Sequence, residues 1–230
     1  MSNSSLVSYT RISPNRTSPR NHKIDTITIH CVVGQLSVET LGDIFAPTSR
    51  QASCNYGIGA DGRIAMYVEE KDRSWCSDSA SNDHRAITIE VASDTSHPYA
   101  VNDKAFESLI NLLVDICKRN DIKELLWKGD KSLVGQVSKQ NMTVHRWFAN
   151  KSCPGDYLYN KHGEIATEVN KRLGGNVMFK DVPETHWAYK AIKELAEKGI
   201  IKGYEDGTFR PNEPVTRAEI ATIISRLKGE

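Results

Sequence analysis

The sequence has no long hydrophobic run and no excess of either charge. No apolar stretch approaches the roughly 18 residues of a membrane span, which argues against a membrane-embedded protein. The formal net charge is +1, and acidic and basic residues balance on both sides of Gly175. Because nucleic-acid-binding domains carry a basic excess, this balance argues against a nucleic-acid partner. The composition is that of a globular protein with one medium domain and a smaller one.

The N-terminus lacks the apolar segment of a secretory signal peptide. Residues 1–20 are polar and rich in serine and arginine, whereas a signal peptide needs a continuous apolar core. The sequence therefore predicts synthesis in the cytoplasm, with any export by another route. Cysteine is scarce as well: five residues, an odd number, do not form the dense paired set of a disulfide-stabilised domain.

Up to residue 173 the chain alternates between strand and helix patterns, which predicts an α/β domain with a mixed central sheet flanked by helices. Runs rich in Ile, Val and Thr indicate strands, and apolar residues at helical spacing indicate helices. Two glycines then break the chain, and we place a domain boundary between residues 175 and 176. The expected elements are a strand at 24–33, a helix at 37–45, a hairpin at 55–68, a strand at 86–92, a helix at 103–119, a short strand at 142–147 and a helix at 156–173.

Three polar residues stand in or at the ends of these strands. Neighbouring strand residues point to opposite faces, so Cys31 shares the apolar face of its strand and His30 lies on the more polar one. Glu90 interrupts an apolar strand, which costs several kcal/mol unless the carboxylate has a partner or a function. His145 belongs to a third strand. The pattern alone leaves two interpretations open: one common site, or unrelated polar residues on solvated sheet faces.

Cys153 lies eight residues after His145, in the stretch "NKSCPGDYLY". By itself it is open to four interpretations: an unpaired thiol, half of a disulfide, a nucleophile or a metal ligand. No flanking signature of a thiol hydrolase accompanies it. Cys117 stands among apolar residues at helical spacing and is expected to be a buried core thiol. The other histidines are expected to be solvated: His22, His84, His97, His162 and His186.

The segments "TITIH", "SCNYGIGADGRI", "AITIEVA" and "VHRWFANKSCPGDYL" together resemble the type 2 N-acetylmuramoyl-L-alanine amidases, a family that includes phage endolysins and peptidoglycan recognition proteins. The resemblance covers roughly residues 20–174. It implies that His30, His145 and Cys153 are ligands of a zinc ion, so Cys153 is not a nucleophile. Three protein ligands leave a fourth position for water, as in catalytic zinc sites. Lys151 and the start of the following helix are expected to favour the thiolate.

The resemblance also implies a reaction. It is hydrolysis of the amide between the lactyl group of N-acetylmuramic acid and the L-alanine of the stem peptide in peptidoglycan. Glu90 matches the general base of the family, and Lys151 is expected to stabilise the oxyanion. Tyr56 matches a position where related enzymes place a catalytic tyrosine, with packing in the hairpin as the alternative. Trp75 is expected either to line the substrate groove or to belong to the core.

Residues 179–227 resemble one S-layer homology repeat, on the stretches "FKDVPETHWA", "GYEDGTFRPN" and "TRAE". The pattern indicates two helices joined by a loop, the second opened by a capping box of Thr216 and Glu219. The resemblance implies binding of secondary cell-wall polysaccharide, with Trp187 and Arg217 as contacts. The family usually has three repeats in one chain. The single repeat is therefore expected to join repeats of other chains in a homo-oligomer or to dock on the amidase domain.

Together these features predict a modular peptidoglycan amidase. A zinc-dependent catalytic domain is expected at 1–175 and a small all-α helix-loop-helix module, the wall-binding repeat, at 176–230. The polar N-terminus favours a phage or prophage endolysin that reaches the wall of a Gram-positive host after release. The alternatives are a host autolysin, a peptidoglycan-binding module without catalysis, and a structural surface-layer protein. The complete set of His30, His145 and Cys153 argues against the module without catalysis.

Overall fold

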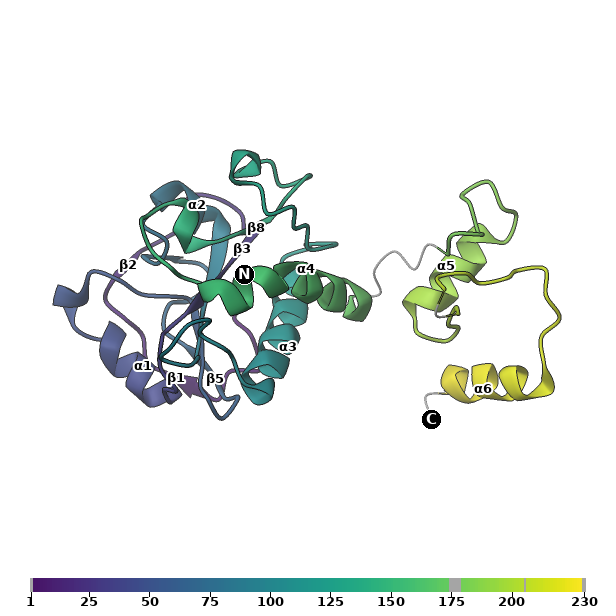
Figure 1. Cartoon of the computed structure of the whole chain (residues 1–230), viewed down its shortest axis with the longest axis horizontal. Coiled ribbons are helices and arrows are strands. Elements are labelled where there is room, and N and C mark those ends of the chain that lie inside the picture. Colours follow the sequence, from purple (N-terminus) through teal and green to yellow (C-terminus); the bar gives the residue numbers. More distant parts are fainter. Residues whose placement is uncertain (1, 174–178, 205, 229–230) are drawn as a thin grey trace. The chain divides into compact units, whose positions relative to one another are not determined.

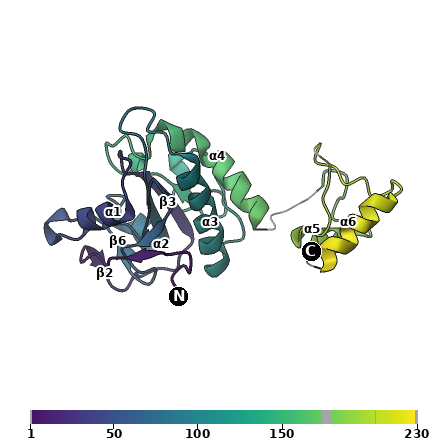
Figure 2. The ribbon, with the colours of Figure 1, turned by 90° about the horizontal axis from the view of Figure 1, so that it is seen from below.

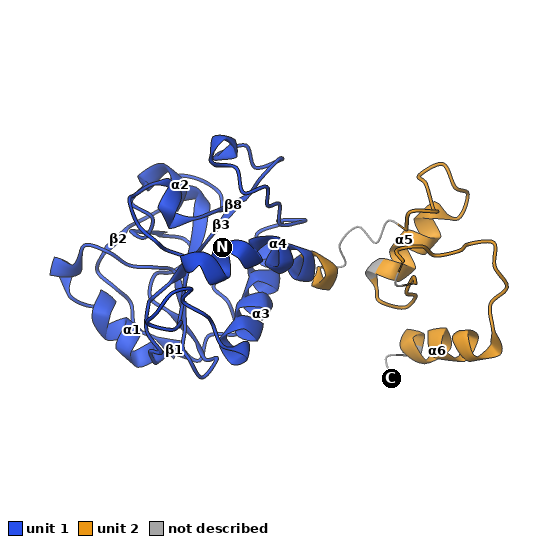
Figure 3. Cartoon of the chain, in the orientation of Figure 1, with its two compact units in different colours: residues 1–169 blue, residues 170–230 orange. Residues whose placement is uncertain are grey.

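The computed structural model of the chain describes residues 2–173, 179–204 and 206–228. The chain divides into two compact units, residues 1–169 and 170–230, which Figure 3 shows in separate colours. The domain boundary predicted between residues 175 and 176 lies outside the described residues. In the part of the chain that is described, no helix has both the length and the apolar character to cross a membrane.

A six-stranded mixed sheet forms the centre of unit 1 (Figure 1). β3 (Thr26–Cys31) and β7 (Ala86–Val91) run parallel and pair in register, so that His30 lies opposite Glu90. Their many β-branched residues suit this buried position. The order of strands in the sheet is β1-β5-β4-β7-β3-β8. The other four strands of this sheet are β1 (Tyr9–Thr10), β4 (Tyr56–Ile58), β5 (Ile64–Met66) and β8 (Met142–Thr143). A separate two-stranded sheet is formed by β2 (Arg16–Thr17) and β6 (Arg73–Ser74).

Helices cover both faces of the sheet. In Figures 1 and 2, α3 (Asp103–Arg119) and α4 (Gly155–Arg172) lie side by side on one face, and α1 (Val38–Phe45) lies on the other. α1 packs on the sheet through Leu41 and Phe45. The predicted α/β class, with a mixed central sheet flanked by helices, is confirmed. The shorter helices of this unit are α2 (Ala80–Arg85), η1 (Thr48–Arg50), η2 (Lys131–Leu133) and η3 (His145–Trp147).

Most elements of unit 1 lie where the sequence places them. The helix predicted at 103–119 has those limits, and the predicted hairpin forms from β4 and β5. The exception is 142–147, which was expected to be one strand. Only Met142 and Thr143 pair with β3, and the next residues form the 3-10 turn η3. Because the strand ends before His145, loop contacts rather than strand pairing position this histidine.

One of the histidines expected at the surface is buried. His162 on α4 has no exposed surface, and its Nδ1 lies 2.6 Å from the carbonyl oxygen of Leu158. Its ring lies 4.4 Å from that of Trp127, which also stacks on Trp147. The prediction of a solvated His162 is wrong because these aromatic side chains cover this part of α4. The prediction of a buried Cys117 is confirmed.

Unit 2 is helical. α5 (Tyr189–Glu197) is followed by Gly199 with a left-handed φ of 69°, and a loop leads to α6 (Arg217–Lys228). The predicted capping box opens α6: the backbone N–H of Thr216 donates to the Glu219 carboxylate, and the N–H of Glu219 donates to the Thr216 hydroxyl. A small apolar core is made by Phe179, Val182, Ile192, Ala196, Ile200 and Ile201.

Candidate active site

The candidate site begins at the end of β3, where His30 is fully buried. β3 pairs with β7 on one side and with β8 on the other, which fixes its backbone. Nδ1 of His30 lies 3.3 Å from Sγ of Cys153 and 4.0 Å from Oε1 of Glu90. Burial, together with the nearby His145, lowers the pKa of His30 to about 3. The imidazole is therefore neutral, which is the form that binds a metal.

His145 and Cys153 come from the loop between β8 and α4. The backbone N–H of Arg146 donates to the carbonyl of Cys153, and its guanidinium donates to the Asp156 carboxylate, so the loop is closed on itself. Gly155 then opens α4 with a φ of 77°. A Cβ at this glycine would lie 2.9 Å from the ring of a neighbouring tyrosine, so only glycine fits the turn.

The donor atoms of His30, His145 and Cys153 lie within 4.8 Å of one another. Zinc–nitrogen bonds of about 2.0 Å and zinc–sulfur bonds of about 2.3 Å place neighbouring ligands of a tetrahedron about 3.5 Å apart. This spacing is close to the 3.3 Å between His30 and Cys153. Two imidazoles and one thiol are also ligand types that zinc accepts. The three residues therefore fit a zinc ion.

The thiol of Cys153 is protonated in this environment. The neighbouring Cys31 thiol and burial raise the pKa of Cys153 above its usual range. A bound cation would displace the proton, because the thiolate is the metal-binding form. This corrects the expectation that Lys151 and the start of α4 favour the thiolate. Lys151 is exposed, where solvent screens its charge.

Asp78 orients His145. Its Oδ2 lies 3.0 Å from Nε2 of His145, so Nε2–H donates to the carboxylate and Nδ1 keeps the lone pair that can bind a metal. Such a carboxylate partner holds a ligand histidine in one orientation and one tautomer. The sequence offers no signal for this role, since Asp78 is one polar residue in a serine-rich turn between β6 and α2.

Glu90 lies beside His30 with one oxygen that lacks a partner. Its Oε1 is 4.0 Å from the thiol of Cys76, while Oε2 is buried and has no hydrogen-bond partner within the described residues. Burial raises the pKa of Glu90 to about 8. A cation held by His30 would lower this pKa, because an opposite charge favours the carboxylate. Glu90 is thus suited to exchange a proton with a reactant next to the metal ligands.

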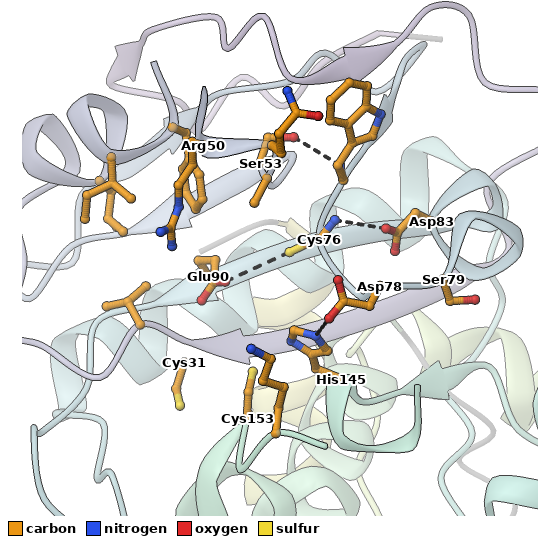
Figure 4. A pocket seen from close by; sticks show the side chains of 18 of the residues that line it. Cys31, Arg50, Ser53, Cys76, Asp78, Ser79, Asp83, Glu90, His145 and Cys153 are labelled. Atoms are coloured by element: carbon orange, nitrogen blue, oxygen red, sulfur yellow. Dashed lines mark hydrogen bonds and ion pairs between the residues drawn. The ribbon is translucent and has the colours of Figure 1, made fainter. Parts of the chain in front are cut away.

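These residues open into a cavity of about 600 Å³. It brings together five side chains that the sequence singled out: Trp75, Glu90, His145, Lys151 and Cys153. Figure 4 shows Glu90, His145 and Cys153 turned toward the same space. Trp75 therefore lies at the groove, while its indole N–H donates to Thr17 and holds the ring in place. The cavity wall also contains Cys31, which the sequence assigned to the apolar face of its strand. Other wall residues carried no sequence signal, among them Arg50, Cys76, Asp78 and Asp83.

The structure does not bring Tyr56 to this cavity. Tyr56 pairs with Ile89, one residue before Glu90, so its side chain points to the other face of the sheet. It is fully buried, its hydroxyl donates to Glu70 at 2.7 Å, and the backbone N–H of Ser4 donates to that hydroxyl. Burial also raises the pKa of Tyr56. Tyr56 therefore packs within the hairpin, which was the alternative interpretation from the sequence.

The two candidate wall-binding residues lie at the surface of unit 2. Trp187 is 90% exposed and stacks on His186 at a ring distance of 5.9 Å. Arg217 is exposed at the first turn of α6. Neither residue lines the cavity of about 580 Å³ in this unit, whose wall includes Tyr204 and Arg210.

The fold and the cluster of possible metal ligands can be compared with models of known protein families. The model of the N-acetylmuramoyl-L-alanine amidase family matches residues 20–156, more than half of the chain. The chain therefore belongs to this family, which supports peptidoglycan amidase activity. The S-layer homology domain matches residues 179–221, which implies association with the cell surface.

The amidase part and the S-layer homology part of the chain are similar to different proteins. The outer membrane protein SlpA of Thermus thermophilus is 55% identical over 53 residues, which are 23% of this chain and only 6% of that protein. An endolysin amidase, LysCS from Clostridium intestinale, has a TM-score of 0.50 at 19% identity and covers 71% of this chain and 93% of its own. The structure of an AmpD derivative has a TM-score of 0.53 at 17% identity, and the match covers 72% of this chain and 99% of that one. At these identities the two structures show the fold alone.

Proposed function

We propose that the chain is a zinc-dependent N-acetylmuramoyl-L-alanine amidase that cleaves the bond between the lactyl group of muramic acid and L-alanine. The observation that carries the proposal is the convergence of His30, His145 and Cys153 beside Glu90, in a cavity of the size of a small-molecule site. The membership in the amidase family supports the same reaction.

His30, His145 and Cys153 would hold the zinc ion, with Asp78 fixing the orientation of His145. The chemistry that a bound zinc supplies at such a site is polarisation of a carbonyl group and acidification of water. His30 is held in place by the central strands, and the Arg146 contacts hold the Cys153 loop. The ligands are therefore largely positioned before the metal binds.

Glu90 serves as general base and acid. It takes a proton from the attacking water as the carbonyl carbon becomes tetrahedral, and returns it to the leaving nitrogen of L-alanine as the C–N bond breaks. The unpaired Oε2 of Glu90 supports this role. Lys151 lines the same cavity and is proposed to stabilise the negative charge on the former carbonyl oxygen. Trp75 forms an apolar wall for the substrate.

For unit 2 we propose attachment to secondary cell-wall polysaccharide through Trp187 and Arg217. A nine-tenths exposed tryptophan supports this role, because an exposed ring face can stack on a sugar. We propose that residues 1–175 serve catalysis and residues 176–230 serve attachment, the limits predicted from the sequence. Release of the enzyme as a phage or prophage endolysin in a Gram-positive host fits this arrangement. A host autolysin is the alternative.

The decisive experiment is digestion of purified peptidoglycan followed by identification of the new chain ends. We expect new N-terminal L-alanine in step with loss of turbidity, and no new reducing sugars. The matched control is Glu90→Gln, which keeps the shape of the side chain. New reducing sugars, or other new N-terminal residues, would assign a different bond specificity. Binding to walls with and without their secondary polysaccharide, compared for Trp187→Ala and Arg217→Ala, tests the proposed attachment.

A further inference from the structure

Charges are unevenly distributed along the active-site cavity. In Figure 4, Arg50 lies on one side of Glu90 and His145, and Asp78 and Asp83 lie on the other side. An anionic group of a substrate is therefore attracted to the Arg50 end and repelled from the Asp78 end. Arg73 and Lys151 also line the cavity, so Arg50 is one of three Arg and Lys side chains in its wall.

The guanidinium of Arg50 lies near Glu90, and its charge partly offsets the rise in the pKa of Glu90 that burial causes. No hydrogen bond or ion pair reaches this guanidinium from 2–173, 179–204 or 206–228. Arg73, which lines the same cavity, instead donates to the hydroxyl of Thr17. A guanidinium offers five N–H donors in a planar fork that matches a carboxylate through two parallel hydrogen bonds. Arg50 therefore keeps available the donors that recognise a carboxylate.

The backbone that carries Arg50 is well anchored, although the side chain is exposed. Its N–H donates to the carbonyl of Pro47, and the side chain of Gln51 donates to the carbonyl of Thr48. The side-chain amide of Asn15 also donates to the carbonyl of Pro47, which ties η1 to the N-terminal segment. A fixed backbone lowers the entropy cost of binding, because only the side chain has to be ordered.

From these observations we propose that Arg50 binds a carboxylate of the stem peptide and selects substrates in which that group is free. This deepens the proposed amidase function and rests on it. The second stem residue is a D-glutamyl residue whose α-carboxylate is either free or converted to an amide. It follows L-alanine, so it lies roughly 7 Å from the scissile nitrogen at about 3.5 Å per extended residue. The peptide then extends toward Arg50 and the glycan toward Asp78.

Two synthetic muramyl peptides that differ only in this group test the proposal. One carries the free α-carboxylate of the D-glutamyl residue and the other the α-carboxamide. We expect the zinc-loaded enzyme to prefer the free acid by roughly 10- to 100-fold in kcat/KM, the range of a charge-assisted pair. Arg50→Gln should remove this preference by lowering kcat/KM for the acid alone, and Arg50→Lys should restore part of it. Arg63→Gln is the matched control, because Arg63 pairs with Glu39 outside the cavity.

Three results would overturn the assignment. If Arg50→Gln lowers kcat/KM equally for both substrates, Arg50 acts on the active site itself. If the unaltered enzyme has the same kcat/KM for the acid and the amide, Arg50 does not recognise the α-carboxylate. If neither substrate is cleaved, the amidase function fails separately, and the dissociation constants of both peptides then decide the role of Arg50. Equal affinities for the acid and the amide would exclude the proposed role of Arg50.

Discussion

Sγ of Cys153 lies 3.3 Å from Nδ1 of His30, although 123 residues separate them in the chain. The pairing of β8 with β3 brings the two segments together, and the bond from the Arg146 N–H to the Cys153 carbonyl sets the loop. The contact therefore depends on the folded backbone, which is what a site of defined metal geometry requires.

The first prediction follows from this contact. The purified protein should hold one zinc ion per chain, and Cys153→Ser or His145→Ala should lower the affinity for zinc, because each removes one of three ligands. Atomic absorption and competition with a chromogenic chelator measure this. Cys117→Ala is the matched thiol control, since Cys117 lies on the buried face of α3 and not at the site. Full zinc occupancy in the Cys153→Ser, His145→Ala double variant would exclude this site.

The second prediction separates catalysis from metal binding. Glu90→Gln and Lys151→Ala should retain zinc but lose about 2 to 4 orders of magnitude in kcat, the range for loss of a proton-transfer group or an oxyanion donor. Zinc content and turnover are measured on the same preparations. Near-normal turnover by Glu90→Gln would show that another group moves the proton.

The third prediction concerns Tyr56. Because its hydroxyl contacts Glu70 and Ser4 on the face of the sheet away from His30, Tyr56→Phe should leave kcat/KM unchanged. It should lower the free energy of unfolding by about 1 to 3 kcal/mol, the cost of leaving buried partners unsatisfied. Urea unfolding and kinetics measure the two effects, with Tyr67→Phe as a buried control. A large loss of kcat in a stable Tyr56→Phe protein would restore a catalytic role.

Strand and helix patterns were sufficient to place the central elements of unit 1. β7 and α3 follow from residues whose periodicity reflects burial, and the same periodicity puts His30 and Glu90 on one face. The side of the sheet to which Tyr56 points could not be predicted, because it depends on how β4 aligns with β7. One residue of shift in that alignment would reverse the face.

Loop residues escaped prediction for a different reason. Asp78 and Arg50 have no periodicity, and their positions depend on contacts from distant segments, such as the Asn15 amide at Pro47. His162 was misassigned because a helical histidine carries no local sign of what covers it. Here Trp127, from a loop without regular structure, provides the cover. Local sequence determines elements, whereas burial of single polar residues depends on tertiary packing.

The fourth prediction uses the burial of His162. Burial lowers its pKa from 6.5 to about 4, so between these values the unfolded chain binds a proton that the folded chain excludes. The free energy of unfolding should therefore fall as the pH drops from about 6.5 toward 4, by at most about 3 kcal/mol from this residue. Urea unfolding of unit 1, followed by tryptophan fluorescence, measures it.

The control for this prediction is His162→Gln, which cannot gain the proton. It is expected to be less stable than the parent at pH 7, because the aromatic packing against Trp127 is lost. Its stability should nevertheless change less between pH 7 and pH 5 than that of the parent. An identical pH dependence in both proteins would mean that His162 does not cause the acid sensitivity.

The fifth prediction concerns assembly through unit 2. α6 leaves Ile220, Ile224 and Leu227 at 43%, 47% and 58% exposure, whereas Ile223 packs against the small core. Because repeat units bury their apolar faces against neighbours, we expect α6 to associate with α6 of other chains. Such assembly would also increase avidity for a repeating wall polymer.

Sedimentation at tens of micromolar should therefore give a mass above the 25.7 kDa of one chain. The double variant Ile220→Glu, Ile224→Glu should be monomeric, because it places charges on the apolar face, and it should remain folded since both side chains are already exposed. Ser225→Glu, on the same helix, is a matched control for added charge. A truncation at residue 175 should also be monomeric. If the full chain sediments as a monomer as well, association between chains is excluded, and docking within one chain becomes the account of the exposed face of α6.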